Sequence, residues 1–144
     1  MLVSQILKLK SDADVVTIAP DASLEDAVRL LSTHKIGAVV VSSGGKGVAG
    51  ILSERDIVRQ LGIDGASCLS ARVATIMTAK IVSCGRNETS DEVLAKMTEG
   101  RFRHMPVMDG AEMVGLISIG DVVKARLQTL SMEKEALEGM IKGF

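Results

Sequence analysis

Two heptads hold the side chains of this chain that are best suited to bind a small molecule. They read Gly50-Ile51-Leu52-Ser53-Glu54-Arg55-Asp56 and Gly115-Leu116-Ile117-Ser118-Ile119-Gly120-Asp121. In each, a glycine and an apolar pair end a predicted strand, and a serine and an aspartate follow as the next helix begins. The free N–H groups and the positive dipole end of a helix N-terminus suit a phosphate. The aspartate can accept hydrogen bonds from a ribose diol.

Each aspartate also has a purely structural interpretation, as a carboxylate that favours the helix dipole by about 0.3–1 kcal/mol. Because both copies keep serine at the same offset, we favour ligand binding for Asp56 and Asp121. Basic side chains near the heptads are candidates for phosphate contacts or for a solvated surface: Arg55, Arg59, Arg101, Arg103 and Lys124. Arg103 and His104 are the better candidates, because they begin a predicted strand.

The apolar periodicity predicts the elements that position the heptads. In the first half we expect a leading helix over 3–10, a strand over 15–18, a helix capped by Ser23, strands over 36–41 and 48–52, and a helix over 54–61. A loop over 62–68 and a short helix over 70–77 lead into the second half. There we expect a strand over 81–83, a helix over 89–99 with Thr89 and Glu92 as a capping box, strands over 103–108 and 113–117, and a long final helix from about 120.

The two halves are an internal repeat. Asp26 and Glu92 hold equivalent positions 66 residues apart, and Gly50 and Gly115 hold equivalent positions 65 residues apart. The pattern predicts an α+β fold of two tandem β-α-β-β-α repeats, which pack around a pseudo-two-fold axis because neither buries its apolar face alone. We assign residues 1–66 to the first repeat with its leading helix, and residues 67–144 to the second with an extended C-terminal helix.

Composition narrows the function classes. The chain has 144 residues, 47% of them hydrophobic, a formal charge of −1, and Phe102 and Phe144 as its only aromatic residues. It therefore lacks the basic field and the stacking platforms of a nucleic-acid-binding protein. The first residues do not resemble a signal peptide and no apolar run is long enough to span a membrane, so we expect a cytoplasmic protein without a membrane partner.

Catalytic and metal centres are not predicted. Cys68 and Cys84 lack metal-ligand spacing and are expected to be reduced thiols, and Asp12 and Asp14 lack the downstream residues of a calcium loop. His104 has no nucleophile or second acid paired with it by a recognisable motif. An enzyme, for example a nucleotide hydrolase, is therefore the least favoured of the three hypotheses weighed below.

Several motifs resemble the tandem cystathionine-β-synthase domain pair, the CBS pair or Bateman module. They are Ile76-Met77-Thr78, the stretch from Arg101 to Val107, and both heptads, and the resemblance covers essentially the whole chain. More narrowly, the stretches 53–58 and 118–124 are similar to small bacterial stand-alone CBS-pair proteins. The resemblance implies a cleft between the repeats that binds AMP, ADP or ATP, sometimes NAD(H) or S-adenosylmethionine, with no metal needed for the fold.

The resemblance also implies a set of ligand-binding residues. Asp56 and Asp121 would hold ribose hydroxyls, with Ser53 and Ser118 near the phosphate or ribose. The base would be enclosed by residues of the entry and middle strands, which are Thr17, Ile18, Gly37 and Ala38 in the first repeat and Val82, Ser83, Arg103, His104, Met105 and Pro106 in the second. The second heptad has Gly120 where the first has Arg55, so the two sites are expected to differ in phosphate affinity.

The final helix carries a surplus apolar stripe, which predicts packing on the leading helix or on a second subunit. CBS pairs commonly form homodimers, so we expect a dimer. The leading hypothesis is a non-catalytic regulatory module that senses energy or cofactor status through an adenine nucleotide and passes the signal to a separate effector protein. The alternative is a dimerisation or protein-interaction module whose clefts bind no ligand. The sequence does not select the nucleotide, the number of occupied clefts or the effector.

Overall fold

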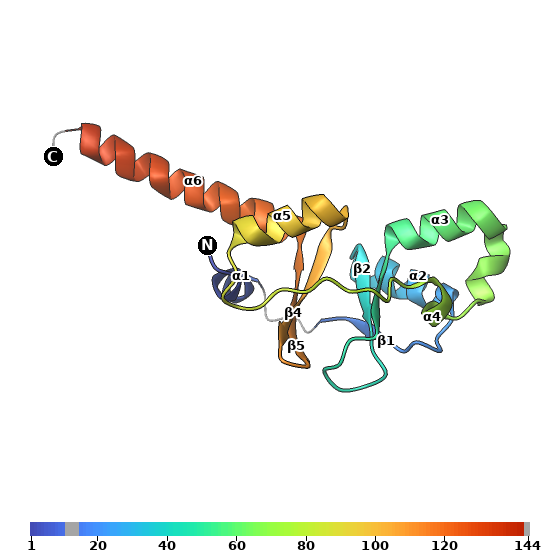
Figure 1. The fold of residues 1–144 in the computed structure, drawn as a ribbon. Helices are drawn as coiled ribbons and strands as arrows, with labels where there is room; N and C mark the ends of the chain where they lie inside the picture. Colours follow the sequence, from blue (N-terminus) through green and yellow to red (C-terminus); the bar gives the residue numbers. More distant parts are fainter. Residues whose placement is uncertain (11–14, 143–144) are drawn as a thin grey trace. The chain divides into compact units, whose positions relative to one another are not determined.

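The structure is a computed structural model, and it describes residues 1–10 and 15–142. Asp12, Asp14 and Phe144 lie outside the described residues. The chain forms two compact units (Figure 1). The first-repeat unit comprises residues 14–81 and 110–114, and the second-repeat unit comprises residues 1–13, 82–109 and 115–144. We describe each unit by itself.

The first-repeat unit is a three-stranded sheet with helices. Its elements are β1 (Thr17–Ile18), α2 (Leu24–His34), β2 (Ala38–Val41), β3 (Gly50–Ser53), α3 (Glu54–Asp64), the 3-10 helix η1 (Gly65–Ser70) and α4 (Val73–Ile76). The strand order is β1-β2-β3, with β1 parallel and β3 antiparallel to β2. Buried apolar residues from the helices and strands of this unit form its core: Leu24, Ala27, Leu31, Val39, Val41, Leu52, Ile57, Cys68 and Val73.

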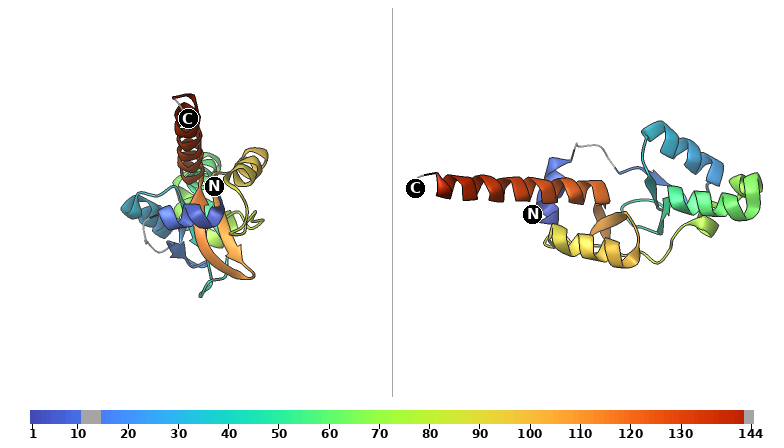
Figure 2. Two further views of the ribbon diagram at one scale, coloured as in Figure 1. Left: turned by 90° about the vertical axis from the view of Figure 1, so that its left-hand side faces the viewer. Right: turned by 90° about the horizontal axis from the view of Figure 1, so that it is seen from above.

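The second-repeat unit has a helix, two strands and a final helix in the same order, and its final helix is longer. Its elements are α1 (Val3–Leu9), α5 (Ser90–Gly100), β4 (His104–Asp109), β5 (Glu112–Ser118) and α6 (Ile119–Ile141). Strands β4 and β5 form a two-stranded sheet, and α5 packs along the first turns of α6 (Figure 1). The second half of α6 extends beyond α1 and α5, as the views in Figure 2 show.

The predicted helix starts are confirmed by their caps. Ser23 accepts a hydrogen bond from the N–H of Asp26, and Thr89 and Glu92 form the expected capping box of α5. Both α2 and α5 end at a residue in the left-handed conformation, Lys35 with φ 53° and Arg101 with φ 56°. The repeat therefore extends to the backbone conformation at both ends of this helix.

Three sequence predictions need correction. The predicted strand over 81–83 is not a strand, because the segment pairs with β4 through one bridge, Cys84 with Val107, before the chain turns and the N–H of Gly85 bonds to Glu88. The predicted loop over 62–68 is helical, since α3 continues to Asp64 and η1 follows it. The short helix predicted over 70–77 spans only Val73–Ile76.

The short helices α1 and α4 hold equivalent places in the two units. In the first-repeat unit the N–H of Val73 donates to the carbonyl of Ala22 at 2.8 Å, and in the second-repeat unit the N–H of Val3 donates to the carbonyl of Glu88 at 2.8 Å. The matching bridges join Ser23 to Arg72 and Leu2 to Thr89. Each unit thus uses a short helix from outside its own β-α-β-β-α segment to cover the start of α2 or α5.

This exchange explains the glycine that opens each heptad. A Cβ at Gly50 would lie 2.6 Å from Sδ of Met77 and 2.8 Å from the carbonyl oxygen of Thr78. A Cβ at Gly115 would lie 2.7 Å from a methyl group of Leu7. The strand before the heptad serine therefore needs glycine because the residues of α1, or those ending α4, pack directly on its backbone.

The Lys10 side chain fastens the end of α1 to the second-repeat unit. Its ammonium group donates to the carbonyl of Leu116 at 2.6 Å and to Oδ2 of Asp121 at 2.8 Å. In the first-repeat unit the equivalent carbonyl, that of Ile51, accepts from the backbone N–H of Thr78 at 2.8 Å. The Lys10 side chain thus takes the place of a backbone donor.

We predict that Gly50→Ala destabilises the protein by about 1–3 kcal/mol, because its Cβ meets a backbone carbonyl that cannot rotate away. Gly115→Ala should cost less, since it meets only the flexible end of Leu7. Gly47→Ala is the control, because a Cβ there meets nothing within 4 Å. The measurement is the free energy of unfolding of the three variants by chemical denaturation. Equal losses of stability for Gly50→Ala and Gly47→Ala would contradict the close packing on Gly50.

We predict that Lys10→Met destabilises the protein by about 1 kcal/mol at pH 7. Burial raises the pKa of Asp121, but hydrogen bonds from Lys10 and Ser118 and the Lys10 charge outweigh it and lower that pKa. A lowered carboxyl pKa stabilises the fold above the unfolded value near 3.8, and this stabilisation is lost as pH falls through the folded value.

The difference between Lys10→Met and the unchanged protein should therefore shrink at pH 3–4, as denaturation curves at both pH values would show. Lys8→Met is the control, because Lys8 is an exposed lysine of the same helix. A loss of stability that does not depend on pH would argue against the Lys10–Asp121 contact. An equal loss in Lys8→Met would also argue against it.

Candidate functional site

The first heptad places Ser53 and Asp56 in a reciprocal cap at the start of α3. Oγ of Ser53 accepts from the N–H of Asp56 at 3.3 Å, and Oδ2 of Asp56 accepts from the N–H of Ser53 at 2.9 Å. The other carboxylate oxygen, Oδ1, lies 3.2 Å from Nη2 of Arg59. Asp56 is 7% exposed, whereas the Arg59 side chain is 67% exposed. A ligand that binds Oδ1 must therefore displace the exposed Arg59 guanidinium or share the oxygen with it.

The second heptad builds the same cap at the start of α6. Oγ of Ser118 accepts from the N–H of Asp121 at 3.2 Å, and Oδ2 of Asp121 accepts from the N–H of Ser118 at 2.9 Å. The ion pair differs, because Lys10 of α1 approaches Oδ2 in place of an arginine from the same helix. Asp121 is therefore ionised at neutral pH and keeps the acceptor character that a ribose diol requires.

A hollow of about 410 Å³ opens beside Asp121, between α1 and the first turns of α6. Two lysines, Lys10 and Lys124, and one carboxylate face it together with the polar Gln128. Its remaining lining is aliphatic: Ile6, Leu9 and Ala125. The hollow thus combines a hydroxyl acceptor, two cationic groups and an apolar wall, which are the groups that a ribose, a phosphate and a flat base need.

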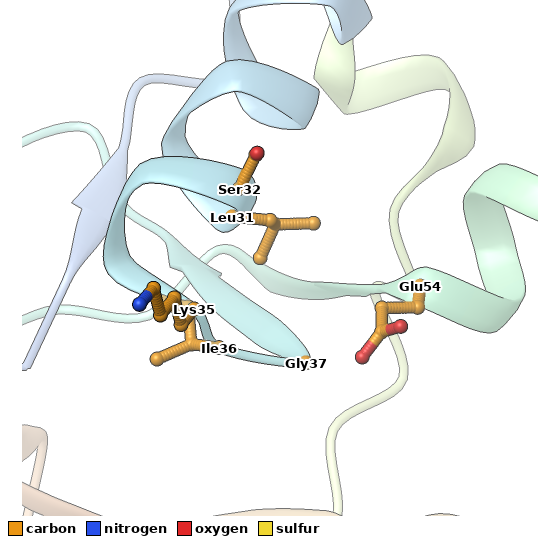
Figure 3. Close-up of a pocket in the computed structure, with 6 residues that line it drawn as sticks. All are labelled: Leu31, Ser32, Lys35, Ile36, Gly37 and Glu54. Carbon is orange, nitrogen blue, oxygen red and sulfur yellow. The ribbon is translucent and has the colours of Figure 1, made fainter.

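A second hollow, of about 330 Å³, lies in the first-repeat unit at the C-terminal end of α2 (Figure 3). It is lined by Leu31, Ser32, Lys35, Ile36, Gly37 and Glu54. Figure 3 shows the Glu54 carboxylate at one side and the Lys35 ammonium group at the other. Gly37 is the one predicted site residue in this lining, and Ser53 and Asp56 are not part of it.

The strand register brings some predicted residues of the first repeat together. Ala38 pairs with Ser53, and the N–H of Glu54 donates to the carbonyl of Gly37 at 3.0 Å. Thr17 and Ile18 pair instead with Val40 and Val41, two to three residues farther along β2. Arg55 is exposed on the first turn of α3. Gly37, Ala38 and the part of the first heptad from Ser53 onward therefore lie at one end of the sheet, and Thr17 and Ile18 lie toward the other, where Gly50 pairs with Val41.

The second-repeat unit repeats the hydrogen bond between Glu54 and Gly37. The N–H of Ile119 donates to the carbonyl of Arg103 at 2.8 Å, as Glu54 does to Gly37. Arg103 is exposed and His104 is half-buried, so both side chains lie at the surface near the second heptad. Met105 and Pro106 are buried in β4, and only their backbone or a rearrangement would make them available to a ligand.

Val82 and Ser83 lie on the irregular segment before Cys84. Val82 is exposed, and the carbonyl of Ser83 accepts from Nζ of Lys96 at 3.2 Å. Cys84 is buried, and burial together with Glu88 raises the pKa of its thiol to about 11. The thiol is therefore protonated at neutral pH and is a poor nucleophile.

Two residues of these sites have no local sequence pattern that marks them. Lys10 contacts a carboxylate 111 positions away, so nothing near it in the sequence indicates its partner. Glu54 lies inside the first heptad, but only the return of α2 beside it places its carboxylate in a hollow. The equivalent of Glu54 in the second heptad is Ile119, so a comparison of the two heptads does not indicate the role of Glu54.

Residues 1–10 and 15–142 contain no group of three or more His, Cys, Asp or Glu side chains arranged to hold a metal ion. In the same residues, none of the helices combines the length and apolar character that crossing a membrane requires.

Comparison with known proteins agrees with the repeat. The CBS domain profile matches residues 3–63 and 73–128. A mitochondrial CBS domain-containing protein of Arabidopsis thaliana, CBSX3, is 33% identical over 98% of this chain and 72% of its own length. A crystal structure of a CBS-domain containing protein from Agrobacterium tumefaciens is 46% identical, covers 88% of this chain and 99% of its own, and superposes with a TM-score of 0.83.

A more distant structure shares the fold alone. The CBS domain protein of Pyrobaculum aerophilum complexed with AMP is 21% identical, covers 84% of this chain and 89% of its own, and has a TM-score of 0.72. The profile match in both halves and the similar bacterial structure agree with the two duplicated α+β units. The chain therefore belongs to the CBS-domain family and carries two CBS domains in tandem.

Proposed function

We propose that this protein is a non-catalytic regulatory module that binds an adenine nucleotide, AMP, ADP or ATP, with NAD(H) as a further candidate. The observation that carries the proposal is the hollow beside Asp121, where an ionised ribose acceptor lies at a helix N-terminus with Lys10 and Lys124. The AMP complex of the Pyrobaculum aerophilum relative supports the ligand class. We further propose that the protein acts in the cytoplasm as a homodimer.

In this proposal the Asp121 carboxylate accepts hydrogen bonds from the ribose hydroxyls, and the two lysines neutralise the phosphates. Ser118 keeps the carboxylate oriented through the cap. The other residues that we propose as ligand-binding in the second repeat lie outside the lining of this hollow: Val82, Ser83, Arg103, His104, Met105 and Pro106. In the first repeat Asp56 takes the same part, with Thr17, Ile18, Gly37, Ala38, Ser53 and Arg55 around it.

The two carboxylates should not bind equally well. A ligand at Asp56 competes with the Arg59 fork, which is exposed and can turn toward a phosphate instead. A ligand at Asp121 competes with Lys10, which also holds a backbone carbonyl and the end of α1. Binding at Asp121 therefore changes the contacts of α1. The ligand shifts α1 toward the arrangement, with or without the Lys10 contacts, to which it binds more tightly.

The competing function is an interaction module without a ligand. The reciprocal caps favour it, because they already give both aspartates a structural role at the start of α3 and α6. The two functions differ in what the carboxylate charge does. The cap uses it to stabilise a helix, whereas the proposed site uses it to bind a ligand.

We predict that one adenine nucleotide from a panel of AMP, ADP, ATP, NAD and NADH raises the unfolding temperature by roughly 5–10 °C at 100 times its dissociation constant. Asp121→Asn should remove most of that rise, and Asp56→Asn should reduce it if the first site also fills. The measurement is thermal unfolding with and without ligand, followed by titration calorimetry of the active nucleotide.

Glu92→Gln is the matched control. Glu92 completes the capping box of α5, so its loss has the same effect on a helix cap without touching either heptad. The control should lower the unfolding temperature without ligand and leave the ligand-induced rise unchanged. A flat response of the unchanged protein to the whole panel would refute nucleotide binding and leave the interaction module.

A further inference from the structure

The exposed face of α6 carries a second pattern, separate from the surface that packs on its own unit. Apolar residues at alternating spacings of four and three mark a coiled-coil seam, interrupted by one lysine: Val123, Leu127, Leu130, Lys134, Leu137 and Ile141. At about 100° per residue these six positions fall within roughly 80° of arc. The five apolar members are all exposed. We call these six residues the α6 seam.

The α6 seam is not the face that anchors the helix. Val122 and Ala125 are the buried residues of α6, and they face roughly 130° away from the seam. Every residue from Leu130 to Glu138 is exposed, so the described residues leave this part of the helix uncovered, and it extends beyond α1 and α5 (Figure 2). An apolar stripe of this length on a solvated helix is typical of an interface with another helix.

We propose that the occupant of the α6 seam is the α6 seam of a second copy, in antiparallel orientation. If Leu127 faces Leu137 of the second copy, every other layer is fixed by the same register. Val123 then faces Ile141 of the second copy, and Leu130 faces Lys134. All six positions find a partner, because the seam is symmetric about residue 132. The seam thus complements its own reversed copy.

Charge favours the antiparallel over the parallel arrangement. Lys124 and Glu138 flank the seam on the same side, and the antiparallel register places Lys124 of each copy beside Glu138 of the other. A parallel pair would instead stack the two Lys134 side chains in one core layer and separate Lys124 from Glu138 by roughly 21 Å along the axis. The dipoles of two antiparallel helices also oppose each other favourably.

The lysine in the seam fits this arrangement. Nζ of Lys134 lies 3.9 Å from Oε1 of Glu138 on its own helix, so the ammonium group is directed to the edge of the seam. Its aliphatic stem can cover Leu130 of the second copy while the charge remains solvated. A single polar residue in such a seam lowers stability and sets the register.

This inference gives a geometry to the homodimer proposed above and does not depend on nucleotide binding. Its test compares Leu137→Asp with Met132→Asp by equilibrium sedimentation without nucleotide. The Leu137 side chain is 58% exposed and the Met132 side chain is 60% exposed, but Met132 lies about 180° around the helix from the seam. Leu137→Asp should weaken dimerisation roughly 100-fold or more and Met132→Asp should leave it unchanged. Both variants should keep the helix content and unfolding temperature of the monomer.

Orientation is tested by oxidative cross-linking. An equimolar mixture of Leu127→Cys and Leu137→Cys should cross-link between the two variants, and neither variant alone should cross-link to itself. The unchanged chain is the control, since Cys68 and Cys84 are both buried. Self-cross-linking of either single variant would show a parallel pair and overturn the proposal.

The charges supply an independent check. Lys124→Glu alone and Glu138→Lys alone should each weaken self-association about tenfold, because two attractive pairs become repulsive. Mixing the two variants should restore association, since each glutamate then faces a lysine. The α6 seam would be refuted if the unchanged protein stayed monomeric at 100 times the protein concentration used in the nucleotide titrations. It would also be refuted if the dimer were insensitive to Leu137→Asp. The nucleotide response would remain a separate result in either case.

Discussion

Each unit depends on backbone hydrogen bonds from a short helix that lies outside its own repeat. Val3 and Val73 are fully buried, and their N–H groups bind the carbonyls that precede α5 and α2. This contact brings α1 and the end of α4 against the strands that open the two heptads, which is why glycine stands at Gly50 and Gly115. The heptad glycines are therefore a packing requirement, and the serine and aspartate that follow them are the chemical part of the motif.

The same constraint makes the two repeats chemically unequal. In the first-repeat unit a backbone N–H satisfies the carbonyl of Ile51, and Asp56 pairs with Arg59 of its own helix. In the second-repeat unit one side chain, Lys10, satisfies both the equivalent carbonyl and the aspartate. The lowering of the Asp121 pKa follows in part from this substitution, and Lys10 also lines the hollow between α1 and α6. A duplicated backbone thus carries two different electrostatic environments.

Helix α6 connects the two proposals, because it begins at the Asp121 cap and ends along the α6 seam. Its first turns are held by α1 and α5, whereas its second half is exposed. The helix has 23 residues, and its buried residues, Val122 and Ala125, lie in its first two turns. Substitutions at Asp121 and at Leu137 can therefore alter the ligand site and the assembly surface separately, whereas Lys124 belongs to both.

The sequence by itself determined the repeat, the order of most elements and the caps, because these rest on periodicity and on contacts within four residues. Serine and aspartate three positions apart form a reciprocal cap whatever surrounds them. β-branched composition predicts a strand over 81–83, but composition cannot show that this segment pairs with β4 through only one bridge. Only the tertiary structure decided that Lys10 meets Asp121, that α1 covers the second repeat and that Glu54 borders a hollow. Those contacts join residues far apart in the chain, and their geometry follows from packing rather than from local pattern.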